Sequence, residues 1–544
     1  MNSQPDQNNS ALNNIQHFID IGTALSTERD LTILLEKILF SAKSITQADG
    51  GTIYSVENSD QLKFEILVND SMDLHRGGTS NVAVGFANIP MYLEHGPNSH
   101  ALVAYAAATD QVINIQDAYK DRRYDLNAAR EMDKKNNYST KSVLTIPMKN
   151  HEGTLIGVIQ LINAQSNGEI VAFSQEMEKI TVAMTSMAAV ALTKWQLIDD
   201  MEALFQSFTR LIAKAIDEKS PYTGEHCRRV PELTMMIAHG VNQLSIGQFA
   251  DFCMSEPELH ALNLAGWLHD CGKIATPEYV MDKATKLHGL YDGIDNVNTR
   301  FELAKSQLQL QASEQIIDAI KQDDLSAIGH IEQQRDQAVA QLKKDRAFIQ
   351  RINPGGEYMQ PEAQARVLSI AKGYSISVDD ELRPILSEQE VTNLQVARGT
   401  LNAKERAIIN RHMDTTVEML DALPFPKHLK QVPEYACGHH EKMDGSGYPK
   451  GLNKSQLSVP ARMMGIADIF EALTSSDRPY KPAKKLSECL TIMGYMKKDQ
   501  HIDGDLFDIF VYQKIYLQFA KKFLPASQID EIIESDIPFY TPPK

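Results

Sequence analysis

The residue types best suited to chemistry lie in four short segments of the C-terminal half. These are TGEHCRRV at 223–230, LHDCGK at 268–273, HHEKMDGSGYP at 439–449 and IADIFEALTSSDRPYK at 466–481. His412 lies between the second and third segments. Imidazole nitrogens and carboxylate oxygens together suit divalent transition metals that keep open positions for water and phosphate. The segments therefore indicate a metal site that handles a phosphoryl group.

Two pairs of adjacent residues favour a shared site. In the pair His269–Asp270, one residue can bind a single metal while the carboxylate bridges two. The pair His439–His440 can point both rings into one site only where a helix end or loop lets consecutive side chains converge. The glycines and proline of DGSGYP predict such a loop. A lone histidine or HD dipeptide is usually an ordinary packed or surface feature, but four such segments in order are hard to attribute to chance.

The segments HDCGK and HHEKMDGSGYPKGL resemble the HD and GYP signatures of the HD-GYP family of phosphohydrolases. The resemblance covers roughly residues 205–530 and is interrupted by an insertion. It implies an all-helical fold, a binuclear or trinuclear iron or manganese centre, and hydrolysis of cyclic di-GMP. Some members of the family instead prefer 3′,3′-cyclic GMP-AMP.

The family's metal ligands all have counterparts in this sequence. The resemblance implies two divalent ions, iron or manganese, with the carboxylate of Asp270 between them. The other ligands divide into one set of His226, His269 and Asp468 and a second set of His412, His439 and His440. Trinuclear members carry a glutamate at the position of Tyr222, which favours two ions here over three.

The resemblance also implies roles around the scissile phosphate. Asp270 and Lys273 are the expected catalytic residues, with Lys273 on the phosphate. Arg478 and Lys481 are expected to hold the dinucleotide, although one extra residue after Asp468 makes their register less secure. The GYP loop adds two further residues to the expected substrate site, Asp444 and Tyr448. The product would be a linear dinucleotide or, after a second cut, GMP.

Two other functions remain open at this point. The chain could be a catalytically silent receptor for a cyclic dinucleotide, although it keeps all seven ligand positions. It could also be an HD hydrolase of mononucleotides, which would not need the GYP loop. Three cysteines lie beside proposed ligands (Cys227, Cys271 and Cys437), and we expect them to be buried packing residues rather than ligands.

The stretches INIQDAYKDRRYD at 113–125 and YSTKSVLTIPMKNHEGTLIGVIQLINA at 138–164 resemble a GAF domain, closest to the type in cyclic-nucleotide phosphodiesterases. The nucleotide-binding subset has Asn-Lys after the last strand and later an Asp-Glu pair after a phenylalanine. Here Ala164 follows Asn163, and SQEMEK follows Phe173. The resemblance leaves open an unknown small-molecule ligand or a ligand-free domain used for dimerisation.

Composition limits the kinds of partner that the protein is expected to bind. The formal net charge is -17, which argues against DNA or RNA and against an anionic membrane surface. The odd number of cysteines, 5, fits a reducing compartment better than a disulfide framework. The N-terminus lacks the basic start and apolar stretch of a signal peptide, so we expect a cytoplasmic protein.

Apolar spacing predicts the organisation of the chain. The expected fold is multidomain: an α+β GAF sensor, a long linker helix, and an all-α HD-GYP domain with an inserted helical hairpin. The linker helix could pair with its copy, which predicts a homodimer. The expected ranges are a disordered start at 1–13, the GAF domain at 14–175, the linker helix at 176–217, the HD-GYP domain at 218–530 with an insertion at 290–395, and a tail at 531–544.

Overall fold

The computed structural model describes residues 23, 30–58, 60–219, 225–356, 358–475 and 483–544. It divides into two compact units, Met1–Leu204 and Phe205–Lys544, and each is described by itself. The segment 1–13, predicted to be disordered, lies outside the described residues.

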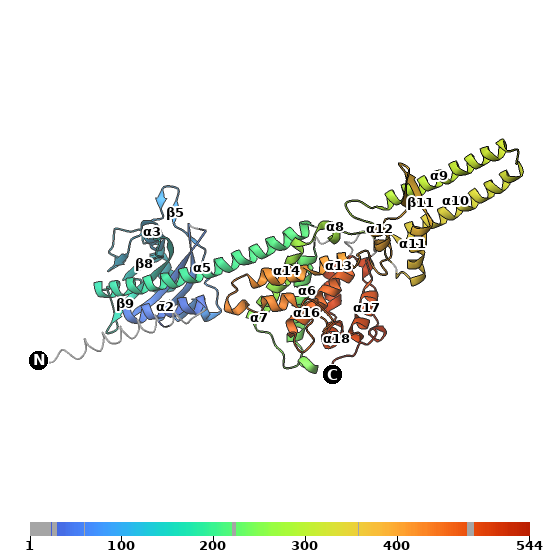
Figure 1. Cartoon of the computed structure of the whole chain (residues 1–544). Helices are drawn as coiled ribbons and strands as arrows, with labels where there is room; N and C mark the ends of the chain where they lie inside the picture. Colours follow the sequence, from blue (N-terminus) through green and yellow to red (C-terminus); the bar gives the residue numbers. More distant parts are fainter. Residues whose placement is uncertain (1–22, 24–29, 59, 220–224, 357, 476–482) are drawn as a thin grey trace. The chain divides into compact units, whose positions relative to one another are not determined.

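The first unit is built on one antiparallel sheet in the order β3-β2-β1-β9-β8-β7, with β10 added to β9 and β4 added to β2 (Figure 1). Four strands, β1, β2, β8 and β9, coincide with runs of apolar residues that predict strands in the sequence: GGTIYSV at 50–56, KFEILV at 63–68, SVLTIPM at 142–148 and TLIGVIQLIN at 154–163. The strands of the unit are β1 (Ala48–Glu57), β2 (Gln61–Asn69), β3 (Leu74–Gly77), β4 (Ile89–Pro90), β5 (Tyr92–Leu93), β6 (Gly96–Pro97), β7 (Ile113–Ile115), β8 (Val143–Lys149), β9 (Leu155–Ser166) and β10 (Glu169–Val171).

Helices cover both faces of this sheet because its strands bury side chains on both sides. Along β9, Ile159 and Leu161 point into a core shared with α2 (Leu31–Thr46) and the start of α5 (Gln175–Lys219). Val158, on the other face, joins a core with α3 (Leu102–Thr109). This alternation follows the two-residue period of a strand. A further helix, α4 (Asn127–Asn136), precedes β8.

The second unit is a helical bundle around one large apolar core (Figure 1). Among the described residues, no helix of the chain combines the length and apolar content that a membrane span requires. The bundle contains α6 (His226–Asn242), α7 (Glu256–Leu268), η3 (Cys271–Ala275), α8 (Glu278–Met281), α13 (Ala403–Asn410), α14 (His412–Asp421), α15 (Val432–Cys437), α16 (Val459–Thr474), α17 (Leu486–Lys498), α18 (Gly504–Tyr512) and α19 (Ile515–Phe523).

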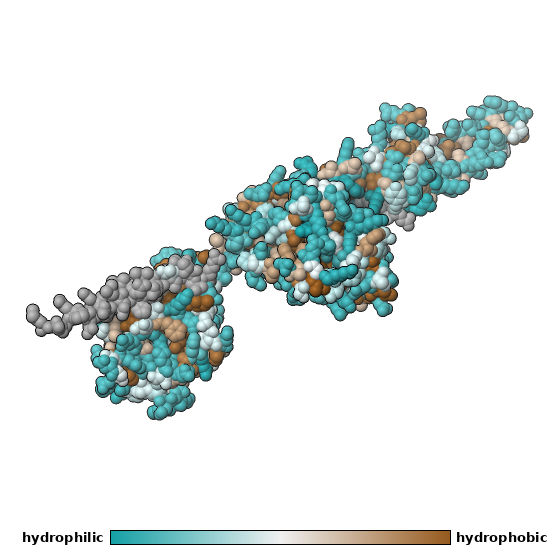
Figure 2. Space-filling model, turned by 90° about the horizontal axis from the view of Figure 1, so that it is seen from below, coloured by the Kyte–Doolittle hydropathy of each residue, from teal (hydrophilic) through white to brown (hydrophobic). Residues whose placement is uncertain are grey.

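The insertion has its own small core between α8 and α13 and is not wholly helical. Its elements are α9 (Ile294–Lys321), α10 (Ser326–Ile352), α11 (Pro361–Gly373), β11 (Ser375–Val378), β12 (Glu381–Pro384) and α12 (Glu388–Leu394). The predicted helical hairpin is α9 and α10, whose surface is mainly hydrophilic in Figure 2.

The prediction of an entirely helical insertion misses the hairpin of β11 and β12. Its two-residue turn is Asp379–Asp380, with φ of 52° and 64°. Two successive residues with positive φ are typical of the tight turns that join antiparallel strands. The Asp-Asp pair was therefore the sequence signal for this turn.

Candidate metal centre

The structure brings together all seven sequence-predicted metal ligands, although they come from segments far apart in the chain. Most of them lie at helix ends, where consecutive residues can turn toward a common point. His226 begins α6, His269 and Asp270 follow α7, His412 begins α14, His439 and His440 lie in the turn after α15, and Asp468 lies inside α16.

The ligand atoms form two groups, and within each group they lie within 4.8 Å of one another. The groups are His226, His269 and Asp468, and Asp270, His412, His439 and His440.

Asp270 faces both groups with different oxygens. Its Oδ2 is 3.3 Å from His226 Nε2 and 3.2 Å from His269 Nε2. Its Oδ1 is 3.3 Å from His412 Nε2. A carboxylate in this position can be shared between two cations.

Backbone hydrogen bonds orient three of the imidazole rings. His269, His412 and His439 each place Nδ1 at 2.5–2.7 Å from the backbone carbonyl three residues earlier. With Nδ1–H donating to the carbonyl, Nε2 carries the lone pair, as in metal-binding histidines. The backbone at these three helix ends therefore sets the direction in which each ligand nitrogen points.

Several buried polar atoms of the site make no hydrogen bond with the residues that the structure describes. They are Asp270 Oδ1, His412 Nε2 and His439 Nε2, all on residues with at most 4% exposure. Buried polar atoms in folded proteins nearly always have a partner. A cation would satisfy all three, so the residues present fit divalent metal ions.

Close packing between η3 and α14 holds Asp270 beside His412. A Cβ added to Gly272 would lie 2.0 Å from the His412 carbonyl oxygen, so only glycine fits there. The Gly272 N–H also donates to Thr416 Oγ1 at 3.0 Å. The glycine of HDCGK therefore brings the two groups of ligands close to each other.

Lysine and histidine neighbours keep the two carboxylates ionised. Burial opposes the ionisation of Asp270, but Lys273 and His269 outweigh it and hold the pKa of Asp270 well below its usual range. Burial likewise opposes the ionisation of Asp468, and the hydrogen bond from His226 outweighs it and lowers its pKa. Both side chains therefore offer negatively charged oxygens at neutral pH.

Burial keeps the adjacent histidines neutral. It lowers the pKa of His440 to about 4 and that of His439 well below its usual range, with neighbouring histidines adding to the effect for His439. Their rings lie 4.2 Å apart. Neutral imidazole is the form that binds a metal.

Glu471 is a residue of the candidate site that the sequence reasoning did not identify. It is 1% exposed, and its Oε2 lies 2.5 Å from His226 Nδ1. It follows Asp468 by three residues on α16, which places both carboxylates on one face of the helix. Burial lowers the pKa of His226, but Asp270, Asp468 and Glu471 outweigh it and raise that pKa well above its usual value. The spacing Asp-x-x-Glu was the available signal.

Lys273 is held beside the proposed metals by an ion pair between its Nζ and Asp270 Oδ2. Its side chain is 20% exposed. Burial opposes its charge, but Asp270 outweighs burial and raises the pKa of Lys273, so the ammonium stays protonated. The three cysteines near the ligands are buried, and burial raises their pKa, to about 11 for Cys271 and about 12 for Cys437.

The GYP loop lies against His440. The ring of Tyr448 stacks on the His440 imidazole at 4.8 Å. A Cβ at Gly447 would lie 2.4 Å from the Lys442 nitrogen, so this position requires glycine. Buried Glu441 accepts hydrogen bonds from two backbone N–H groups of the loop, those of residues 450 and 452. Asp444 is exposed and accepts from the Ser446 N–H at 2.9 Å, which closes a turn in the loop.

The remaining sequence-predicted residues cannot be placed. Arg478 and Lys481, the expected dinucleotide contacts, lie outside the described residues, and so does Tyr222. In the first unit, Asn163 is buried and bonds to the Tyr138 hydroxyl and the Ser139 carbonyl, so it has a structural role at the end of the sheet.

Family models match two parts of the chain: a GAF domain at residues 30–192 and an HD domain at residues 389–506. The HD match begins near the end of the insertion and includes His412, His439, His440 and Asp468. His226 and the His269–Asp270 pair, which precede the insertion, lie before it.

Curated phosphodiesterases of two kinds are similar to parts of the chain. A dual 3′,5′-cyclic-AMP and -GMP phosphodiesterase 11A of Takifugu rubripes is 31% identical over 34% of this chain and 19% of its own length. The 3′3′-cGAMP-specific phosphodiesterase 1 of Vibrio cholerae is 38% identical over 21% of this chain and 25% of its own length. The 3′3′-cGAMP-specific phosphodiesterase 3 of the same organism is 40% identical over 18% of this chain and 20% of its own length. The chain thus matches a quarter or less of the length of these relatives.

The comparison with solved structures includes the GAF domain of an Acinetobacter phosphoenolpyruvate-protein phosphotransferase, which is 14% identical with a TM-score of 0.26, covering 34% of this chain and 97% of that one. The two family models show that the chain contains a GAF domain followed by an HD domain, and its resemblance to HD-GYP phosphodiesterases with an N-terminal GAF domain is confirmed.

Proposed function

We propose that the chain is a metal-dependent phosphodiesterase that hydrolyses a cyclic dinucleotide to a linear dinucleotide. The observation that carries the proposal is the position of Asp270, which offers one oxygen to each of two groups of imidazole and carboxylate ligands. Iron or manganese suits this nitrogen and oxygen ligand set. When bound, two such ions would lower the pKa of a water molecule and offset charge on the phosphoryl oxygens.

The chain's own residues supply the rest of the chemistry. The two ions would be held close to each other by Asp270, His226 and His412. Lys273, a partly exposed ammonium beside Asp270, would neutralise charge that develops on the phosphate. The Tyr448 ring, stacked on His440, would form one wall for the substrate. Arg478 and Lys481 remain proposed contacts to the dinucleotide.

The substrate class follows from the relatives and from the GYP loop. The two Vibrio cholerae relatives are named for 3′3′-cGAMP, and cyclic di-GMP is the other candidate. A GYP loop packed on the proposed metal ligands supports a cyclic dinucleotide, because a mononucleotide hydrolase would not need this loop. We therefore place cyclic dinucleotides ahead of mononucleotides.

The test is a chromatographic assay of the full chain loaded with iron or manganese under anaerobic conditions. The substrates are cyclic di-GMP, 3′,3′-cyclic GMP-AMP and a mononucleotide. A linear dinucleotide as product supports the proposal. Tight binding of a cyclic dinucleotide without turnover would instead show a receptor, and turnover of the mononucleotide alone would show the third function.

The proposal includes a homodimer formed through α5. Six apolar residues of this helix lie on one stripe, the first separated from the second by seven residues and the others by the three- and four-residue steps of a coiled coil, and each is more than half exposed. They are Val190, Leu197, Met201, Leu204, Phe208 and Leu211, with exposures of 55–68%. A second copy of α5 would bury this stripe. The dimer would then contain two GAF domains, each connected through α5 to its own HD domain. We propose that the GAF domain regulates hydrolysis through this paired helix.

A further inference from the structure

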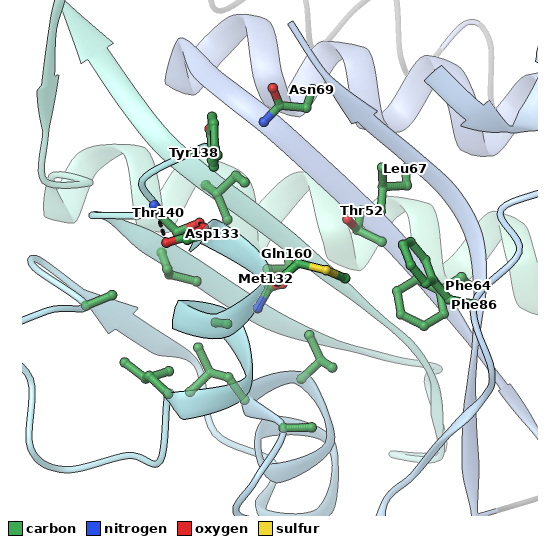
Figure 3. Close-up of a pocket in the computed structure, with 18 of the residues that line it drawn as sticks. Thr52, Phe64, Leu67, Asn69, Phe86, Met132, Asp133, Tyr138, Thr140 and Gln160 are labelled. Atoms are coloured by element: carbon green, nitrogen blue, oxygen red, sulfur yellow. Dashed lines mark hydrogen bonds between the residues drawn. The ribbon is translucent and has the colours of Figure 1, made fainter. Parts of the chain in front are cut away.

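One helix, α5, runs from the first unit into the second, and its last residue is Lys219. The GAF domain contains a cavity of about 480 Å³ between its sheet and the segment that carries α3 and α4. Figure 3 shows Phe64 and Phe86 at one end of this cavity and Tyr138 at the other. All of the residues that line the cavity precede α5 in the chain. Contacts at the end of α5 therefore determine which part of the second unit a change in the GAF domain can reach through this helix.

Within the second unit, the end of α5 packs against the helical bundle. Ala213 and Ile216 are at most 1% exposed and belong to the apolar core of the bundle. Lys219 follows Ile216 by three residues, so the two side chains are neighbours on one side of the helix. The Lys219 side chain is partly buried and reaches the backbone that follows the His269–Asp270 pair.

The ammonium of Lys219 donates to three backbone carbonyls at the C-terminal end of η3. They belong to Lys273, Ile274 and Thr276, and Lys219 Nζ lies 3.5 Å from the first oxygen and 2.7 Å from the third. An ammonium has three N–H donors, so three converging carbonyls can use all of them. The last carbonyls of a helix lack acceptable partners within the helix itself. Lys219 therefore supplies, from α5, the donors that close the end of η3.

The opposite end of η3 is held by α14. There the Gly272 N–H donates to Thr416 Oγ1, and the close approach of the two backbones leaves no room for a side chain. Between the two contacts, the Lys273 N–H donates to the Asp270 carbonyl at 2.9 Å, and the Thr276 N–H donates to the Lys273 carbonyl at 3.0 Å. The ion pair with Asp270 directs the Lys273 ammonium, but the turn that Lys219 closes places the Lys273 backbone.

We propose that Lys219 is a positioning residue for hydrolysis, which holds η3 from the end of α5 so that the Lys273 ammonium stays beside the scissile phosphate. The inference rests on the proposed phosphodiesterase activity, in which Lys273 neutralises charge on the phosphate. A displacement of the end of α5 carries the Lys219 ammonium with it and loosens η3. Lys219 thus connects the helix that leaves the GAF domain to the phosphate side of the site, without contact to a proposed metal ligand.

Hydrogen–deuterium exchange of the full chain tests the contact without any hydrolysis. Lys219→Met keeps most of the side-chain length but removes the donors, so the backbone amides of 272–276 should exchange at least about threefold faster. Lys214→Met is the matched control, because exposed Lys214 pairs with Glu218 on the same helix, and it should leave this exchange unchanged. Amides of α18 should keep their protection in both variants, which shows that the bundle remains folded.

Steady-state hydrolysis by the manganese-loaded full chain tests the positioning role, with cyclic di-GMP and 3′,3′-cyclic GMP-AMP as substrates. In Lys219→Met, kcat should fall about ten- to hundredfold while KM changes less than about twofold, because a small misplacement of a catalytic group lowers the rate. The metal content should equal that of the wild type, since Lys219 contacts no proposed ligand. Lys219→Arg keeps a cation with several donors and should recover at least about half of the wild-type kcat.

Three results would overturn the proposal: unchanged exchange at 272–276 in Lys219→Met, faster exchange with an unchanged kcat, or a loss of metal together with the loss of rate. The last result would show a structural role instead of a positioning one. A wild-type chain that hydrolyses neither substrate would refute the proposed function itself, and the exchange measurement would still decide whether Lys219 holds η3.

Discussion

At the residue scale, the candidate centre consists of buried side chains that the protein orients but whose polar atoms do not all find partners among the described residues. Backbone carbonyls fix the histidine rings, and Asp270 extends one oxygen toward each group of ligands. Uncompensated buried atoms of this kind carry a large free-energy cost unless they bind something. The proposed metals would remove that cost, so metal loading should also stabilise the fold.

Replacing the shared carboxylate should affect both ions. Losing a residue that only supports a ligand costs about 10–100-fold in metal affinity or activity. Asp270→Asn removes a direct ligand, so we expect a larger loss of hydrolysis and fewer than two metals per chain. Elemental analysis of purified protein measures the metal content. The exposed Asp414→Asn on α14 is the control and should retain both. An Asp270 variant with full metal content would contradict the proposed bridge.

Glu471 should act through His226 rather than on the substrate. Glu471→Gln keeps the shape but weakens the acceptor at His226 Nδ1, so metal affinity should fall about 10–100-fold. Competition with a metal-binding dye measures this affinity without any substrate. Excess metal should restore hydrolysis, and Glu418→Gln, exposed on α14, should change nothing. A loss of hydrolysis with unchanged metal affinity would show that Glu471 has a different role.

At the element scale, the proposed metal ligands are positioned by helix ends and short connections rather than by α5 or the insertion. α5 leaves an apolar stripe exposed, and the insertion has a separate core of its own. Neither element supplies a residue to the two ligand groups. We therefore expect changes in them to alter assembly or stability while leaving the metal centre intact.

Charges on the α5 stripe should separate the dimer. Met201→Glu with Leu204→Glu places carboxylates in an apolar helix pair, where an unpaired buried charge costs several kcal/mol. The dimer should weaken by at least about a hundredfold, as measured by light scattering across a dilution series. Asp199→Lys, on the opposite side of the helix, should stay dimeric. A wild-type chain that is monomeric at micromolar concentration would refute the coiled-coil pairing.

Lys286 should make the stability of the insertion depend on pH. It is 2% exposed, and burial lowers its pKa from 10.5 to about 8. Between these values the unfolded chain binds a proton that the folded chain does not, so stability rises as pH increases from about 8 to 10.5. Lys286→Met should flatten this rise and add about 1–2 kcal/mol at pH 7, because it removes a buried charge.

Proteolysis in urea, with cuts inside the insertion identified by mass spectrometry, measures this stability at pH 7 and pH 10. Lys283→Met is the matched control. Lys283 pairs with Glu405 at 2.6 Å, so its loss should destabilise the insertion. A Lys286→Met variant that is less stable at pH 7 would show that the hydrogen bond to the Leu394 carbonyl outweighs the burial of the charge.

At the scale of the whole molecule, the fold class could be predicted from apolar patterns, and the proposed ligand groups from the resemblance of short segments to a known family. Apolar runs identified β1, β2, β8 and β9, and the HD and GYP segments identified side chains that the fold brings together. Glu471 was missed although it follows Asp468 by three residues, because its burial and its contact with His226 appear only in three dimensions.

The most direct test of the central claim is anomalous scattering from crystals of the full chain grown with manganese. The proposal predicts two separate manganese peaks, one beside His226, His269 and Asp468 and the other beside His412, His439 and His440, with the Asp270 carboxylate between them. A single peak, or peaks away from these side chains, would contradict the two-metal site on which the proposed phosphodiesterase activity rests.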